Sequence, residues 1–133
     1  VLVTPEIPYN TGAIGRTCVA LNLELILIKP YGFSLDEKSV RRAGTDYWKH
    51  VTLSEYDDWQ SFLAERNPPR EALYYFEEHG AQSESAGLPA SVIGGQEDRV
   101  FHLPMLDRRV RSLNLANVAT AVIYQAMRPQ LGG

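Results

Sequence analysis

The sequence of 133 residues lacks the features that define several common classes of protein. It has one cysteine, Cys18, so no disulfide can form within the chain, and a reducing cytoplasmic location is favoured. No apolar run approaches the roughly 20 residues that a helix needs to cross a bilayer, and no secretory signal is visible. We therefore expect a cytoplasmic protein that does not associate with a membrane.

Motifs of several enzyme classes are also missing. The sequence contains no phosphate-binding Walker loop, no GxGxxG and no G-x-S-x-G. The three histidines, His50, His79 and His102, have no metal-ligand spacing with Cys18. These absences argue against a P-loop nucleotide-binding protein and a serine hydrolase, and they lead us to expect no metal site.

The composition is that of a globular protein. Hydrophobic residues make up 44% of the chain and charged residues 22%, which allows a real core. The length fits one domain, residues 1–133, better than two. A domain of this size buries only about two-thirds of its unfolded surface, so pairing with a second copy would bury more.

Positive charge is scarce but clustered. The net charge is −3, which argues against a broad basic surface for nucleic acid. Two short basic clusters are nevertheless present, at residues 38–42 and 108–111. Each cluster can be a solvated charged face or a set of contacts to phosphate groups, and the sequence leaves both interpretations open.

Short apolar runs bounded by turn residues predict the strands. They lie at residues 1–4, 23–28, near Val51, 72–76 and 100–103. Because helical segments lie between them, the sequence predicts an α/β fold whose mostly parallel sheet is flanked by helices. Ligands of such sheets bind beyond the carboxyl ends of the strands, so the loops after Thr4, Phe76 and Leu103 are candidate sites.

Capping residues ahead of apolar residues at helical spacing predict the helices. The predicted starts are Asn10, Ser34 with Glu37, the segment 54–57, and Ser112 with Asn114. The helix from Ser34 should stop at Gly44. The final helix, over residues 115–126, has the clearest amphipathic stripe.

Three loop segments carry unusual polar residues. The first, residues 5–12, is stiffened by two prolines and is followed by Arg16 one turn into the helix. The second, residues 83–89, includes Glu84 and a Gly-Leu-Pro turn, and the third joins residues 103–105 to 112–115. Taken alone, each segment can be structural: a cap with a surface arginine, an ordinary turn, or a plain cap.

Together these segments resemble the SPOUT superfamily of RNA methyltransferases. The resemblance is closest to its small TrmL-type members, tRNA (cytidine/uridine-34) 2′-O-methyltransferases. Residues 5–16 read PEIPYNTGAIGR, which is similar to the first motif of that family. The other similar segments are residues 30–33, 41–47, 87–89, 104–105 and 112–115. The resemblance extends over nearly the whole chain, with the segments in the same order.

The resemblance implies a fold and a cofactor. The implied fold ties the C-terminal part of the domain in a trefoil knot, a rare exception to the rule that chains do not thread loops. The implied methyl donor is S-adenosyl-L-methionine, the substrate is tRNA, and the active form is a homodimer. By position, six residues are expected at the cofactor: Phe76, Gln82, Gly87, Leu88, Leu103 and Ser112.

The resemblance also assigns roles around the reacting hydroxyl. Arg16 is the candidate for favouring the ribose alkoxide or for orienting a phosphate. Asn10, Glu84 and Asn114 are expected to hold the loops or the ribose. Tyr124 is expected to position the nucleotide or the partner subunit, with a packed helix tyrosine as the alternative. Four arginines are candidates for contacts to tRNA phosphates: Arg41, Arg42, Arg108 and Arg111.

The chain departs from the family pattern in one place. Relatives carry an additional stretch, including a strand, between the positions equivalent to Gly80 and Ser83, and they have a glycine where this chain has Gln82. This departure keeps RNA or cofactor binding without catalysis open as a function. Methylation of another tRNA position or of rRNA is a further alternative within the same fold.

Overall fold

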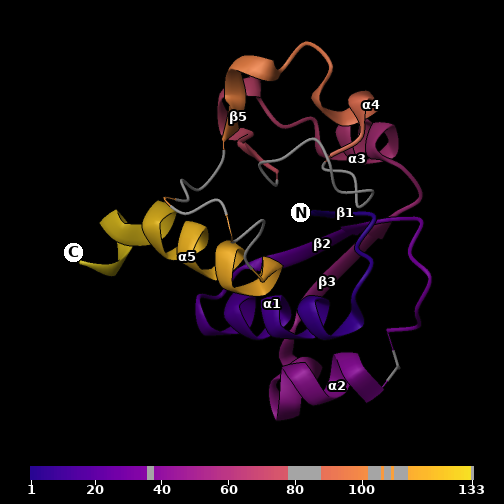
Figure 1. Ribbon diagram of the computed structural model, residues 1–133, viewed down its shortest axis with the longest axis vertical. Helices are drawn as coiled ribbons and strands as arrows, with labels where there is room; N and C mark the ends of the chain where they lie inside the picture. The colour runs from indigo at the N-terminus through magenta and orange to yellow at the C-terminus, as the bar shows by residue number, and fades with distance from the viewer. Residues whose placement is uncertain (36–37, 78–87, 102–105, 107–108, 110–113, 133) are drawn as a thin grey trace. The chain divides into compact units, whose positions relative to one another are not determined.

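The computed structural model describes residues 1–35, 38–77, 88–101, 106, 109 and 114–132. The chain forms two compact units (Figure 1). The first comprises Val1–Asp57 and Asn114–Gly133, and the second comprises Asp58–Leu113. The first unit is therefore built from both ends of the chain.

A three-stranded parallel sheet lies in the first unit. Its strands are β1 (Leu2–Val3), β2 (Glu24–Ile28) and β3 (Thr52–Tyr56), in the spatial order β1-β2-β3. The central strand, β2, is almost wholly buried, as expected for an apolar strand paired on both edges. The strand predicted at residues 23–28 is thus confirmed, and the one predicted near Val51 is the five-residue β3.

The first unit also contains helical elements. They are α1 (Pro8–Ala20), α2 (Lys38–Gly44), the 3₁₀ segment η1 (Thr45–His50), α5 (Leu115–Met127) and the 3₁₀ segment η4 (Arg128–Leu131). Of these, α1 packs on β2. Figure 1 shows α1 between α2 and α5, and α1 contacts both of them. The predicted end of α2 at Gly44 is confirmed.

The first helix begins earlier than the sequence predicted. Its N-cap is Ile7 and its first residue is Pro8, whose fixed φ and missing N–H suit the first helical position. The prediction that Asn10 caps α1 is therefore wrong, because Asn10 lies inside the first turn. The prediction for Asn114 is confirmed: its Oδ1 accepts a hydrogen bond of 3.2 Å from the backbone N–H of Asn117 at the start of α5.

The core of the first unit joins α1, β2 and α5. Its buried residues are Ile14, Cys18, Leu25, Leu27 and Ala116. Burial raises the pKa of the Cys18 thiol, so this cysteine belongs to the packing. The stripe predicted on α5 is confirmed only in part, because Leu115 is 47% exposed whereas Val118, Ala119, Val122 and Ile123 are half-buried.

The second unit contains a two-stranded parallel sheet, β4 (Tyr75–Phe76) and β5 (Val100–Phe101). The other elements are α3 (Trp59–Arg66), η2 (Arg70–Ala72), α4 (Ala90–Ile93) and η3 (Glu97–Arg99). Trp59 stacks on Phe62 at 4.9 Å between ring centroids and meets Tyr75 edge-on at 6.2 Å. These three buried aromatic rings make the centre of the unit.

Two predictions in the second unit need correction. The strand predicted over residues 72–76 is reduced to Tyr75–Phe76, because Ala72 ends a 3₁₀ turn that follows the two prolines at 68 and 69. The cap of α3 is Asp58, whose carboxylate accepts a hydrogen bond of 2.7 Å from the N–H of Ser61, and Ser54 lies in β3. That side-chain hydrogen bond lowers the pKa of Asp58.

All strand pairs that the structure describes are parallel, and helices accompany both sheets. The α/β class and the parallel pairing predicted from the sequence are therefore confirmed. No helix among the described residues is long and apolar enough to cross a membrane.

Candidate functional site

Two asparagines from opposite ends of the chain meet in the first unit. Asn114, the N-cap of α5, donates a hydrogen bond of 3.1 Å from Nδ2 to the Oδ1 of Asn10 in α1. Asn10 is only 5% exposed, and Thr11 beside it is fully buried. The structure thus brings together the first and third loop segments singled out in the sequence, although they are 104 residues apart.

A second polar contact joins the same two helices. The hydroxyl groups of Thr17 and Thr120 lie 2.8 Å apart, two turns along α1 from Asn10. Sequence reasoning missed this pair. The seven-residue spacing between Asn10 and Thr17, which places both on one face of a helix, was the available signal.

Arg16 is exposed on α1 and is held by an aromatic ring. Its guanidinium carbon lies 5.1 Å from the ring centroid of Tyr47, within the range of a cation–π interaction. Tyr47 belongs to η1 and is itself 46% exposed. The ring therefore restricts the guanidinium while leaving it open to solvent.

The close approach of η1 to α1 depends on Gly15. A Cβ atom at this position would lie 2.7 Å from Cζ3 of Trp48, which is closer than such atoms approach in real proteins. The absence of a side chain at Gly15 thus lets Trp48 pack directly against the helix backbone. Because Tyr47 precedes Trp48, this packing also fixes the position of the Tyr47 ring, which faces Arg16.

The remaining predicted residues of the first unit are exposed. Tyr124 is 46% exposed, ten positions after Asn114 and so about 15 Å along the axis of α5. Arg41 and Arg42 are exposed in the last turn of α2. Both arginines are accessible to a phosphate group.

In the second unit, Phe76 lies at the carboxyl end of β4. It pairs in register with Phe101 of β5, and the ring centroids are 5.6 Å apart. The two side chains are 39% and 41% exposed, so they present aromatic surface at adjacent strand ends. Leu88 is half-buried. The other predicted residues lie outside the described residues: Gln82, Glu84, Gly87, Leu103, Arg108, Arg111 and Ser112.

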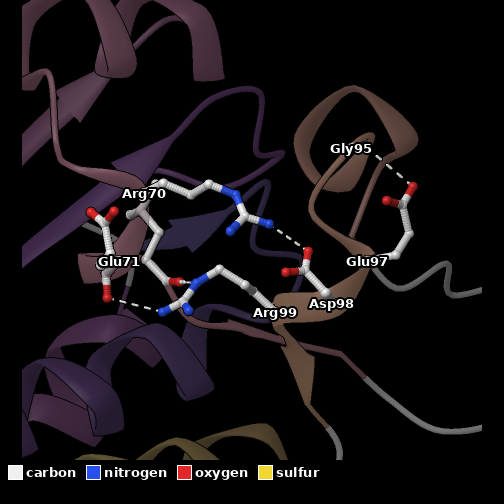
Figure 2. A network of polar contacts seen from close by, with 7 residues as sticks. Arg70, Glu71, Gly95, Glu97, Asp98 and Arg99 are labelled. Carbon is white, nitrogen blue, oxygen red and sulfur yellow. Dashed lines mark hydrogen bonds and ion pairs between the residues drawn. The ribbon is translucent and has the colours of Figure 1, made fainter.

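An arginine network fixes the amino ends of the same two strands (Figure 2). Arg99, just before β5, donates from Nε to the carbonyl of Leu73 at 2.8 Å and from a terminal nitrogen to the carbonyl of Glu71 at 2.9 Å. Its guanidinium also lies 4.5 Å from the ring centroid of Tyr74. Arg99 therefore links the segment before β4 to the start of β5, which stabilises the register of the two strands.

An ion pair supports this network. Arg70 donates to Asp98 at 2.5 Å, and this hydrogen bond lowers the pKa of the Asp98 carboxyl. Gly95 donates its N–H to Glu97 at 3.2 Å, as Figure 2 also shows. Sequence reasoning missed the network because its acceptors include backbone carbonyls, which leave no motif. No cluster of metal-binding side chains occurs among the described residues.

Comparison with known proteins gives the class to which this architecture belongs. Residues 1–83 match the SpoU rRNA methylase family, and the chain belongs to that family. A relative in Escherichia coli strain K12, the tRNA (cytidine(34)-2′-O)-methyltransferase, is 36% identical over 149 residues, which cover 99% of this chain and 92% of the relative. The resemblance inferred from the sequence motifs is thereby confirmed.

Two solved structures of methyltransferases are also similar to this chain. One, from work on the 2-OH methylation of C/U34 on tRNA, is 35% identical with a TM-score of 0.79, covering 99% of this chain and 95% of that chain. The SpoU methyltransferase AviRb from Streptomyces viridochromogenes, in complex with AdoMet, is 26% identical with a TM-score of 0.78. That match covers 99% of this chain and 57% of AviRb.

The alignment also reveals a shortfall in this chain. The match to the Escherichia coli relative runs over 149 residues, whereas this chain has 133, so at least 16 aligned positions have no counterpart here. The motif pattern predicts that these positions lie between Gly80 and Ser83, and their location stays a prediction.

Proposed function

We propose that this protein transfers the methyl group of S-adenosyl-L-methionine to the ribose 2′-hydroxyl of nucleotide 34 of tRNA. The observation that carries the proposal is the contact between Asn10 and Asn114, which joins two motif segments of the family across 104 residues. Similarity to the Escherichia coli tRNA (cytidine(34)-2′-O)-methyltransferase along 92% of its length supports the choice of substrate.

The cofactor is proposed to bind at the carboxyl ends of β4 and β5. Exposed rings of Phe76 and Phe101 at adjacent strand ends fit an adenine, which stacks on aromatic surface. Leu88 adds apolar surface, and the remaining members of this site are Gln82, Gly87, Leu103 and Ser112. The bound sulfonium group supplies an already activated methyl, so the protein needs no covalent intermediate.

Arg16 is proposed to act on the ribose hydroxyl. A guanidinium only donates hydrogen bonds and carries a positive charge, so it stabilises an alkoxide or orients a phosphate but accepts no proton. The cation–π contact with Tyr47 narrows the conformations of Arg16, which reduces the entropy lost on meeting the substrate. Asn10, Glu84 and Asn114 hold the loops or the ribose, and Tyr124 positions the nucleotide or the partner subunit.

Binding of tRNA is assigned to arginines. Arg41 and Arg42 at the end of α2, together with Arg108 and Arg111, contact phosphate groups and set the position of the RNA without reading its sequence.

The proposed assembly is a cytoplasmic homodimer of a single knotted domain, residues 1–133. Tyr124 leaves an aromatic ring exposed on α5, at 46% exposure, that a second copy would cover. The trefoil knot is proposed from the family motifs in the C-terminal half of the chain.

Methyl transfer is tested by incubating the protein with methyl-labelled S-adenosyl-L-methionine and tRNA. A 2′-O-methyl group blocks alkaline hydrolysis at its own nucleotide, so the label should appear in alkali-resistant dinucleotides. Mass spectrometry should place it at nucleotide 34, and a tRNA carrying 2′-deoxyribose there should accept none. Absence of transfer to tRNA by folded protein that binds the cofactor contradicts the proposal, whereas label at another tRNA position or in rRNA identifies the alternative substrate.

The missing aligned positions favour a second candidate function, binding of RNA or cofactor without catalysis. Calorimetry with S-adenosyl-L-methionine and with its demethylated product, S-adenosyl-L-homocysteine, separates the two. A protein that binds either molecule tightly but transfers no methyl group has the second function.

A further inference from the structure

A hollow of about 430 Å³ opens in the first unit where β2 ends. We call it the β2 pocket. Its lining residues are Lys29, Pro30, Tyr31, Phe33, Ser34, Leu35 and Glu55. β2 and β3 are parallel neighbours, so the loop after Ile28 and the end of β3 meet at the carboxyl edge of the sheet (Figure 1). Ligands of open α/β sheets bind at this edge.

Two aromatic rings form one wall of the β2 pocket. The ring centroids of Tyr31 and Phe33 are 5.2 Å apart and their planes are tilted by 34°. Both side chains are half-buried, so part of each ring faces solvent. Because the rings already touch each other, a planar ligand stacks on the outside of the pair instead of entering between them.

The β2 pocket is lined by side chains of both positive and negative charge. The hydroxyl of Tyr31 donates to Oε1 of Glu55, and Lys29 lies 3.6 Å from Asp57 at the rim. A carboxylate accepts several hydrogen bonds, so Glu55 keeps capacity for a donor from a ligand. The same carboxylate repels an anion, which argues against a phosphate group or a carboxylate as the ligand in contact with Glu55.

We propose that the β2 pocket binds one unstacked RNA base that carries an amino group at C6 or C4, adenine or cytosine. The base stacks on the Tyr31–Phe33 pair, and its amino group donates to Glu55. Aromatic platforms hold bases of any sequence, whereas carboxylates select bases that offer an amino donor. This inference rests on the proposed function, because it names a contact to the tRNA substrate outside the reacting ribose.

Binding of an anticodon stem–loop RNA, measured by fluorescence anisotropy without cofactor, tests the stacking. Phe33→Ala should weaken binding at least about fivefold, since stacking of one base is lost. Tyr74→Ala, which removes an exposed ring outside the β2 pocket, is the control and should change affinity less than about twofold. Phe33→Ala protein that remains folded by circular dichroism and binds the RNA as tightly as wild type overturns the proposal.

The carboxylate is tested with base substitutions. Each adenine and cytosine of the loop is replaced in turn by uracil, which offers a carbonyl where the others offer an amine. One replacement should weaken binding by wild type several-fold, and Glu55→Gln should reduce that discrimination because an amide both donates and accepts. Glu65→Gln, a matched charge change on α3, should preserve it. Equal affinity of wild type for every substituted loop contradicts the assignment.

The outcomes separate this inference from the function on which it rests. If wild type neither binds nor methylates tRNA, the proposed function fails. If wild type methylates tRNA and Phe33→Ala binds it equally well, the function stands and the pocket assignment alone is wrong.

Discussion

Gly15 is the residue that sets the geometry around the candidate catalytic arginine. It allows Trp48 to pack against the backbone of α1, and Tyr47, the neighbour of Trp48, lies over Arg16. Any side chain at position 15 must push η1 away from the helix. A substitution at Gly15 should therefore change the position of the Arg16 side chain, although Arg16 itself is not replaced.

We expect Gly15→Ala to lower the free energy of unfolding by roughly 1–2 kcal/mol. The added methyl group overlaps Trp48, and the cost of overpacking exceeds the gain in helix propensity. Denaturant titration followed by tryptophan fluorescence measures the effect. Gly32→Ala is the control, because a Cβ there meets nothing within 4 Å, and its stability should stay within about 0.5 kcal/mol of wild type. Equal stability of the two variants would contradict this account of Gly15.

Arg16→Ala should reduce methyl transfer by at least about 100-fold, because one electrostatic contact to a developing charge is typically worth that much. The affinity for S-adenosyl-L-methionine should not change, since Arg16 is assigned to the ribose and not to the cofactor. Single-turnover transfer measures the first and calorimetry the second. Turnover equal to wild type would remove Arg16 from the mechanism.

Tyr47→Leu is the companion variant, because it removes the ring that restrains Arg16 and leaves the guanidinium in place. Its transfer rate should fall less than that of Arg16→Ala. A loss of roughly fivefold is expected, because the cation–π interaction that is removed is worth about 1 kcal/mol. A larger loss in Tyr47→Leu than in Arg16→Ala would indicate that the tyrosine itself contacts the substrate.

At the residue scale, the sequence predicted which residues belong to the candidate site better than it predicted their structural surroundings. Asn10 and Asn114 were both selected as site residues, yet Asn10 was taken for a helix cap. The error arose because Pro8 begins the helix earlier and Ile7, which has no polar side chain, occupies the cap position. Arg99 escaped notice since its partners are backbone carbonyls at Glu71 and Leu73, and only the fold brings these together.

At the element scale, α1 and α5 are joined by two polar contacts on a largely apolar face. The Thr17–Thr120 pair lies close to the buried Cys18, and the Asn10–Asn114 pair lies at the helix starts. Polar pairs of this kind add little net stability but discriminate against slipped packing, because a shifted helix leaves each group without its partner.

A double-mutant cycle on Thr17 and Thr120 tests this role. Thr17→Val should lower the free energy of unfolding by about 1 kcal/mol, because the hydroxyl of Thr120 loses its partner. The double variant Thr17→Val with Thr120→Val should recover most of that loss, since no unpaired hydroxyl remains. Strictly additive losses, measured by denaturant titration, would show that the two hydroxyl groups do not interact.

Sequence patterns predicted elements well where burial is regular and poorly where it is not. The buried strand β2 and the helix α5 were both found, the latter with its cap at Asn114. The strand expected over residues 72–76 is shorter because Ala72 ends a 3₁₀ turn, and exposed Tyr74 packs against the ring of Phe101 and against Arg99. Aromatic side chains occur both in strands and in cation–π contacts, so composition alone does not distinguish between the two.

At the scale of the whole molecule, the proposed tRNA substrate would meet a protein of net charge −3. Local clusters of arginine have to act against that overall charge, and their effect should be sensitive to salt. The α/β class and the family followed from the sequence. The contacts between α1 and α5 did not, because residues more than 100 positions apart leave no periodic signal.

The variant Arg41→Gln with Arg42→Gln should weaken tRNA binding at 100 mM salt and flatten its dependence on salt. The slope of log K against log salt concentration should shrink by about 1 to 2 units, since two phosphate contacts are lost. Filter binding across a salt series gives the slope. Lys49→Gln, an exposed cation of η1 outside the assigned set, is the control. An unchanged slope in the arginine variant would place the tRNA elsewhere.

The closure of the first unit by α5 has a consequence for biosynthesis. While the ribosome is still making the chain, α1 has been released but the helix that covers its inner face has not yet been made. Contacts such as Thr17 to Thr120 span 103 residues and form only after α5 has been made. Until α5 is made, the apolar face of α1 stays exposed to solvent, and a chain in that state is prone to aggregation.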